Sequence, residues 1–77
     1  MPRLTPVHWK TLKCIFEKAG FVYNRTEGSH IVLEKEGVKR PIIIPKYDEI
    51  GLDIIKSCMR TANMSREQYF KFLEMCK

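Results

Sequence analysis

The sequence predicts a single α+β domain of order αβββα followed by one more helix, with three antiparallel strands. Three observations lead there: an apolar stripe at helical spacing near the N-terminus, three short strand-like segments separated by glycine turns, and two further helical patterns after residue 50. A chain of 77 residues is long enough for one domain, taken as residues 1–77.

The first helix is expected from Pro6 to about Ala19. Thr5 is a favoured N-cap residue, and Pro6 suits the first helical position because its missing N–H has no partner there. Gly20 suits the left-handed position that ends many helices, with Phe21 folding back on the last turn. The apolar stripe consists of Trp9, Leu12, Ile15, Phe16 and Ala19.

Three strands are predicted next, over Phe21 to Arg25, His30 to Glu34 and Val38 to Ile44. Turns at Glu27-Gly28 and Glu36-Gly37 would connect them in meander order. Pro41 has no N–H to donate to a neighbouring strand, so the third strand is expected at a sheet edge.

Two helices complete the chain and should cover one face of the sheet together with the first. The helix after Pro45 repeats apolar residues at helical spacing and is expected to end at Asn63. Ser65 with Gln68 fits a capping box at the start of the last helix. The apolar positions are Leu52, Ile55, Cys58 and Met59, then Tyr69, Phe70, Leu73 and Cys76.

The charge balance favours an anionic partner. The formal net charge is +5 and the pI is near 9.3, which is typical of proteins that bind nucleic acid, acidic proteins or anionic surfaces. No apolar run reaches the length of a membrane span, and the N-terminus lacks the apolar core of a signal peptide. A cytoplasmic protein without a membrane partner is therefore expected.

The three cysteines are expected to be reduced. Cys14, Cys58 and Cys76 are odd in number, far apart and free of any C-x-x-C spacing. This pattern suggests neither a zinc site nor a disulfide framework.

His30 is the candidate reactive side chain. Alternation places His30, Val32 and Glu34 on one face of the strand, with Ile31 and Leu33 on the face toward the helices. An exposed histidine can exchange protons near neutral pH, although spacing alone favours an ordinary exposed strand residue. The other histidine, His8, is interpreted as a surface or half-buried side chain in the first helical turn.

Several motifs along the chain resemble the HicA toxin family. The most specific are the Gly20-Phe21 pair after the first helix, the Gly28-Ser29-His30 triplet entering a strand and the Ile44-Pro45 pair closing the third strand. The likeness also includes Trp9, Leu12, Ala19 and the run Ser65-Arg66-Glu67-Gln68-Tyr69. It covers nearly the whole chain. The family's fold resembles the double-stranded-RNA-binding domain, which agrees with the predicted element order.

The resemblance implies an activity, a partner and a catalytic residue. Such toxins are endoribonucleases that cleave mRNA without a metal or other cofactor, and a HicB antitoxin neutralises them. The catalytic histidine of the family corresponds to His30, acting as general acid or general base. Many members carry a second histidine two residues after the proline, where this chain has Tyr47. With a pKa near 10, a tyrosine is a poor general base at neutral pH, which puts specificity in question more than activity.

Further side chains are expected to contact RNA. Cations stabilise the charge that develops on the phosphate during cleavage, and Tyr47 can stack on a base or donate a hydrogen bond. Lys35, Lys56 and Lys71 are interpreted instead as solvated charges. The expected RNA-binding residues are Arg25, Ser29, Lys39, Arg40 and Tyr47, with Lys10 and Lys13 on the first helix as more remote ones.

Two other functions fit the same residues. One is a non-catalytic RNA-binding module in which His30 only touches the sugar-phosphate backbone, an interpretation that the missing second histidine keeps open. The other is a protein-interaction domain whose basic face meets an acidic partner. Cleavage of RNA in EDTA, lost in His30→Ala, would separate the ribonuclease from both.

Overall fold

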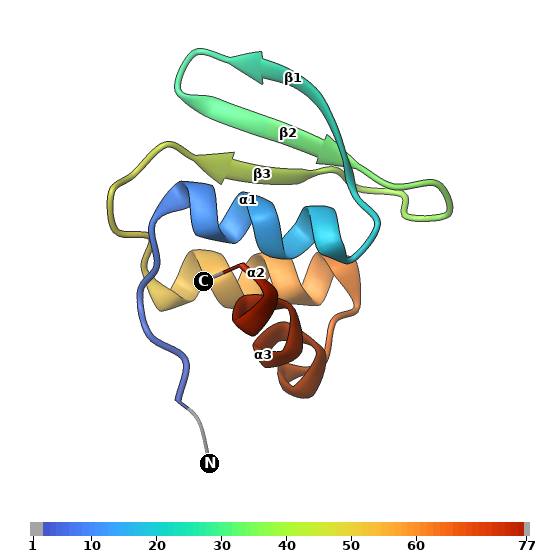
Figure 1. Cartoon of the computed structure of the whole chain (residues 1–77). Coiled ribbons are helices and arrows are strands. Elements are labelled where there is room, and N and C mark those ends of the chain that lie inside the picture. The colour runs from blue at the N-terminus through green and yellow to red at the C-terminus, as the bar shows by residue number, and fades with distance from the viewer. Residues whose placement is uncertain (1–2, 77) are drawn as a thin grey trace.

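The computed structural model describes residues 3–76, and within that range it has the predicted α+β order. The elements are α1 (Trp9–Lys18), β1 (Val22–Glu27), β2 (His30–Glu34), β3 (Ile42–Pro45), α2 (Leu52–Ala62) and α3 (Arg66–Met75). Both strand pairs are antiparallel, in the order β1-β2-β3. Figure 1 shows the sheet on one side of the helices, with β1 farthest from them.

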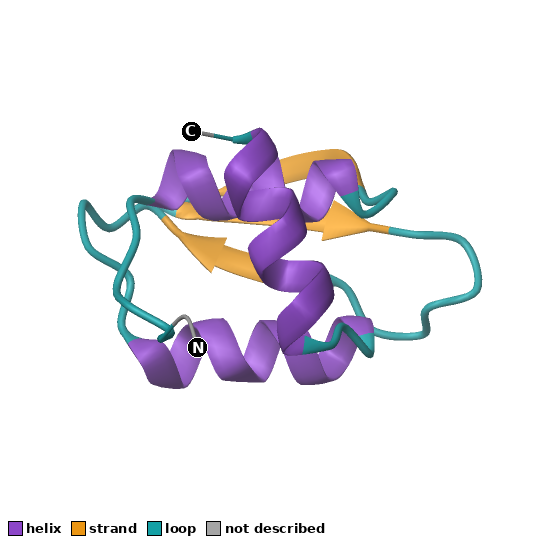
Figure 2. Ribbon diagram, turned by 60° about the horizontal axis from the view of Figure 1, so that its bottom comes forward, coloured by secondary structure: helices purple, strands orange, loops and turns teal. Residues whose placement is uncertain are grey.

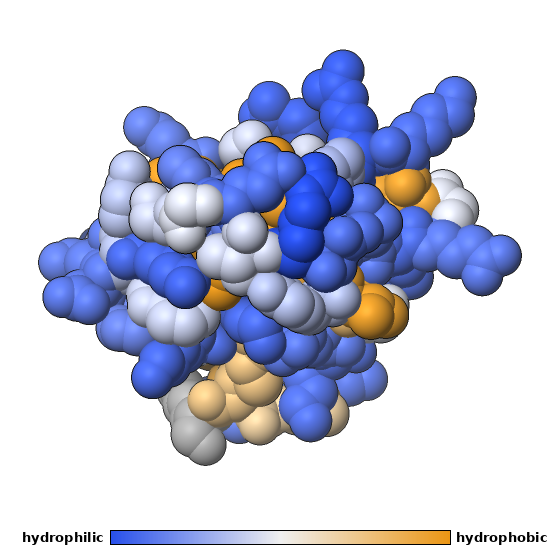
Figure 3. All heavy atoms as spheres, turned by 90° about the horizontal axis from the view of Figure 1, so that it is seen from above, coloured by the Kyte–Doolittle hydropathy of each residue, from blue (hydrophilic) through white to orange (hydrophobic). Residues whose placement is uncertain are grey.

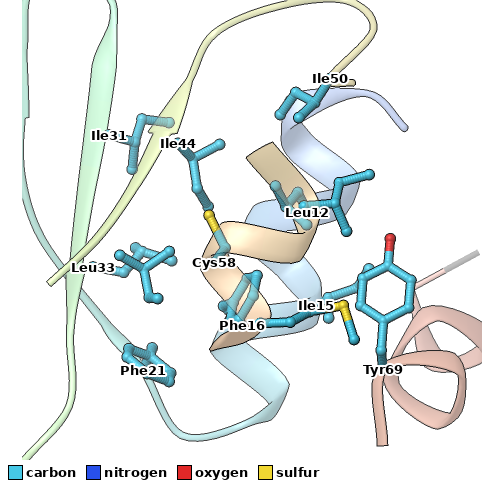
Figure 4. Close-up of a cluster of buried hydrophobic side chains, with 13 residues drawn as sticks. Leu12, Ile15, Phe16, Phe21, Ile31, Leu33, Ile44, Ile50, Cys58 and Tyr69 are labelled. Atoms are coloured by element: carbon cyan, nitrogen blue, oxygen red, sulfur yellow. The ribbon is translucent and has the colours of Figure 1, made fainter. Parts of the chain in front are cut away.

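The helices pack against the β3 side of the sheet. Both α1 and α2 contact β3, while α3 packs against α1 (Figures 1 and 2). The core lies between these layers and takes its side chains from all six elements except β1. In Figure 4, Ile31 and Leu33 point from β2 toward the helices, and Tyr69 reaches in from α3. Fully buried members include Leu12, Ile15, Phe16, Leu33, Ile44, Ile50 and Ile55.

The prediction for the start of the first helix was wrong. The helix begins at Trp9, and His8 is its N-cap, with its Nδ1 accepting a hydrogen bond from the Lys10 N–H. Thr5-Pro6 does not start the helix because Val7 is extended and pairs with Ile50, whose N–H donates to the Val7 carbonyl over 2.7 Å. A pairing across more than 40 residues leaves no local signal in the sequence.

The predicted end of the first helix is confirmed. Gly20 follows the helix with a positive φ of 103°, and the Phe21 N–H donates to the Phe16 carbonyl. The rings of Phe16 and Phe21 pack edge to face, as expected for a chain that folds back on the last turn.

The strands differ from the prediction at their ends. β1 runs to Glu27, so the turn is Gly28-Ser29 and not Glu27-Gly28. β2 has the predicted bounds. β3 is shorter than predicted because pairing begins only at Ile42, after Pro41, and β3 does lie at a sheet edge.

The C-terminal helices follow the predicted signals. Asn63 ends α2 in the left-handed conformation, and Ser65 and Gln68 form both hydrogen bonds of the capping box. Among the described residues, no helix has the length and apolar character needed to cross a membrane.

The prediction of three reduced cysteines was also wrong. Cys14 and Cys76, which are 62 positions apart in sequence, form a disulfide with 6.0 Å between their Cα atoms. The pairing follows from the contact between α1 and α3, which spacing along the chain does not reveal. Cys58 is free and buried.

Candidate active site

His30 begins β2 directly after a two-residue hairpin turn. Gly28 has a positive φ of 59° at the first turn position, as in type II′ turns, where glycine meets no steric penalty. The Lys46 N–H donates to the Ser29 carbonyl over 2.8 Å and ties the turn to the end of β3. The backbone that carries His30 is thus fixed on both sides.

The predicted division of β2 into two faces is confirmed at His30. Its side chain is exposed, while that of Ile31 is 2% exposed and belongs to the core. Val32 shares the face of His30, yet it is only 2% exposed and lies outside the core cluster. The face of β2 away from the core cluster is therefore buried at Val32, whereas His30, at the end of the strand, is accessible.

Glu27 is a neighbour of His30 that the sequence analysis missed. The two residues are directly paired in the β1–β2 register, so their side chains share a face. Arg25, two positions along, forms an ion pair with Glu27, and this hydrogen bond raises the pKa of the guanidinium. The missed signal is local: a two-residue turn at Gly28-Ser29 necessarily pairs residue 27 with residue 30.

A shallow groove of about 380 Å³ runs from His30 to helix α2. Tyr47 lines this groove beside His30 and is 52% exposed, so the structure brings these two sequence-predicted residues together. Asp53 and Ser57, both exposed on α2, form the opposite wall and were not predicted. Helical spacing placed them on α2 without indicating that α2 borders the edge strand.

Cys58 also lines the groove, but it is not suited to nucleophilic chemistry. Burial raises the pKa of its thiol to about 11, so the sulfur stays protonated at neutral pH. Its Sγ lies 3.9 Å from the Ile43 carbonyl, to which it donates a weak hydrogen bond. Histidine is the side chain most often used for proton transfer at neutral pH, so His30 is the better candidate in this groove.

Lys39 and Arg40 lie away from His30. They belong to the connection between β2 and β3, at the far end of the sheet from the Gly28-Ser29 turn. Strand geometry puts this end roughly 10 Å along β2 from His30. These two side chains do not line the groove. Their contact with RNA stays a prediction, and it would involve nucleotides away from His30.

The lysines of α1 face a different groove from that of His30. Lys10 and Lys13 lie beside Tyr23 and Thr26 on the helix side of β1, and Lys13 pairs with Glu17 over 3.1 Å. Lys35 was interpreted as a solvated charge, but its Nζ donates to the Ala19 carbonyl over 2.9 Å and so helps to close the end of α1.

The contacts of His8 are structural. Besides capping α1 through Nδ1, its Nε2 lies 3.6 Å from Asp48, and its exposure is intermediate, as the sequence analysis expected. It does not line the His30 groove. No group of three or more potential metal ligands occurs within residues 3–76, and the expected independence from metal stays a prediction.

Comparison with known proteins identifies the family. No curated protein matches the chain closely. The profile of the family described as HicA toxin of bacterial toxin–antitoxin systems matches residues 9–64, from the start of α1 to just past α2. The match contains the Gly28-Ser29-His30 turn and both walls of the groove, and α3 lies outside it. The chain therefore belongs to the HicA family of toxins from toxin–antitoxin systems.

Proposed function

We propose that this toxin is an endoribonuclease that cleaves mRNA, without a metal, through proton transfer by His30. The single observation that carries the proposal is the placement of His30: an exposed imidazole on a fixed hairpin, open to a groove between the sheet edge and α2. A titratable side chain that is both accessible and held in place is what general acid–base catalysis requires.

RNA supplies the nucleophile for this reaction. The 2′-oxygen forms a bond to phosphorus as the bond to the 5′-oxygen of the next nucleotide breaks, leaving a 2′,3′-cyclic phosphate and a 5′-hydroxyl. The proton leaves the 2′-hydroxyl, and a proton is delivered to the departing 5′-oxygen. His30 performs one of these two transfers, which contributes about 10²- to 10⁴-fold to the rate.

The neighbours of His30 have supporting roles. The Glu27 carboxylate, directly opposite in the β1–β2 register, is proposed to orient the imidazole. Arg25, held by Glu27 on the same face, is placed to contact a phosphate. Tyr47 offers an exposed ring for a base and a hydroxyl for a hydrogen bond. A phenol is a poor general base at neutral pH, so Tyr47 does not replace a second histidine in proton transfer.

The partner of this toxin is proposed to be a HicB-type antitoxin that covers the His30 groove. Inhibition is simplest where the partner occupies the substrate's own surface. Because the chain carries a net charge of +5, acidic residues on the antitoxin would accelerate association, and added salt should slow it.

The test compares two oligonucleotides of one sequence, incubated with the purified protein in EDTA. RNA should be cleaved to fragments ending in a 2′,3′-cyclic phosphate, and its 2′-O-methyl analogue should stay intact because it lacks the nucleophile. Binding of both without cleavage of either would favour the non-catalytic RNA-binding module. Cleavage of the 2′-O-methyl strand would exclude the 2′-hydroxyl mechanism.

A further inference from the structure

A second groove lies between α1 and β1. The main helix–sheet contacts are those of α1 and α2 with β3, and all six residues of β1 are exposed. The resulting hollow, of about 460 Å³, is called here the α1–β1 groove. Figure 3, seen from the β1 side, shows mostly hydrophilic side chains with small apolar patches among them. The groove is lined chiefly by Trp9, Lys10, Lys13, Tyr23, Thr26 and Lys46.

Two ammonium groups converge on one indole ring in this groove. The Nζ atoms of Lys10 and Lys46 each lie 5.6 Å from the centre of the Trp9 ring. Neither lysine has a carboxylate partner among residues 3–76, whereas the charge of Lys13 is balanced by Glu17. The groove therefore presents two uncompensated positive charges, an arrangement that attracts a phosphate.

Aromatic surface accompanies these charges. Tyr23 is 46% exposed and Trp9 is half-buried, so both rings keep some area free for stacking. The Tyr23 hydroxyl lies 2.6 Å from Thr26 Oγ1, and this hydrogen bond holds the tyrosine against its strand. Cations interleaved with aromatic rings are typical of surfaces that bind single-stranded nucleic acid, because phosphates meet the cations and bases stack on the rings.

The α1–β1 groove adjoins the His30 groove through Lys46. Its chain neighbours Pro45 and Tyr47 both line the His30 groove, while Lys46 itself lines the α1–β1 groove. Its N–H also holds the Ser29 carbonyl next to His30. An RNA strand that passes His30 and continues around this end of the sheet would meet Lys46 and then the Trp9 ring.

We propose that the α1–β1 groove is an extended substrate site, which binds nucleotides of the same RNA strand that flank the bond cleaved at His30. The proposal rests on the proposed function, and it adds Trp9, Tyr23 and Lys46 to the residues that contact substrate. Paired ammonium groups around a half-buried aromatic ring favour a strand of nucleotides over an acidic peptide, which would leave the ring without a stacking partner.

The test measures binding of a labelled 2′-O-methyl oligonucleotide of about 16 nucleotides to the intact protein. The Lys10→Ala/Lys46→Ala variant should lower the salt dependence of log K by about 1.4, or 0.7 per lost phosphate contact. At 0.1 M salt this corresponds to roughly 25-fold weaker binding, and the difference should vanish near 1 M. Trp9 is the only tryptophan, so stacking should also quench the protein's emission.

The matched control is Lys18→Ala/Lys71→Ala, which removes the same charge elsewhere. Lys18 lies one helical turn beyond Cys14, on the side of α1 that meets α3, and Lys71 lies on α3. The control should keep the parent's salt dependence.

Three results would overturn the proposal. If both variants bind like the parent while the parent cleaves RNA, the groove is no substrate site and the proposed ribonuclease stands. If Lys10→Ala/Lys46→Ala loses only antitoxin binding, the groove is a protein interface. If the parent neither binds nor cleaves RNA, both proposals fail.

Discussion

The β1–β2 hairpin and the helical layer use their side chains in opposite ways. Every residue of β1 is exposed, and the hairpin ends in a turn that presents His30, Glu27 and Arg25 to solvent. The helices bury the centres of their apolar stripes, as the fully buried Ile15 and Ile55 show. Only the helix-facing side of β2 joins that core. The difference suggests that stability resides in the helical layer and chemistry in the hairpin, so the two should respond separately to substitution.

The largest expected loss of stability comes from truncating the core. Ile15→Ala should lower the free energy of unfolding by about 2–5 kcal/mol, because the side chain is fully buried and its removal leaves a cavity. Val22→Ala is the matched change in the hairpin, where the side chain is 68% exposed, and it should cost less than about 0.5 kcal/mol. Urea unfolding of both variants measures the two losses of stability. Equal losses would contradict the inference that stability resides in the helical layer.

The disulfide should contribute almost as much to the helical layer. Cys76→Ser should lower the free energy of unfolding by about 2–4 kcal/mol, because the bond closes a loop of 62 residues in the unfolded chain. Cleavage by the folded variant should persist, since α3 lies far along the chain from His30 and outside the family match. Unfolding with and without reductant checks this: a parent insensitive to reductant would contradict the pairing.

A smaller loss of stability than that of the core or disulfide variants is expected at two turns of the sheet. Gly28→Ala and Gly37→Ala each place a side chain at positive φ, 59° and 88°, with no atom within 4 Å of the new Cβ. Each should cost about 1–2 kcal/mol from backbone strain alone. Only Gly28→Ala should also slow cleavage, by up to about 100-fold, because that turn positions His30. Equal effects on cleavage would show that the hairpin turn does not set the site.

The sequence predicted the fold where local signals are sufficient. Asn63 and the Ser65–Gln68 capping box stop and start helices through bonds to their own neighbours, so residue type alone indicates them. The predicted start of α1 was wrong because Val7 pairs with a residue far along the chain. The prediction of reduced cysteines was wrong for the same reason, since Cys14 and Cys76 are distant in sequence. Long-range contacts override local preference without leaving a pattern in the sequence.

The candidate site was predictable in part. Alternation along β2 indicated that His30 is exposed, and Tyr47, already predicted to contact RNA, lines the same groove. Glu27 was missed because the turn was placed one residue too early. Asp53 and Ser57 could not be predicted, because no periodicity reveals that α2 borders the edge of β3.

We expect His30 to perform proton transfer and to contribute little to folding. Cleavage of one RNA and thermal melting should therefore be measured on the same preparations of the parent and His30→Ala. His30→Ala should melt close to the parent's temperature, because an exposed strand residue contributes less than about 0.5 kcal/mol, and should lose cleavage by about 10²- to 10⁴-fold. A folded variant that still cleaves RNA would contradict it, and an unfolded variant would show that His30 is structural.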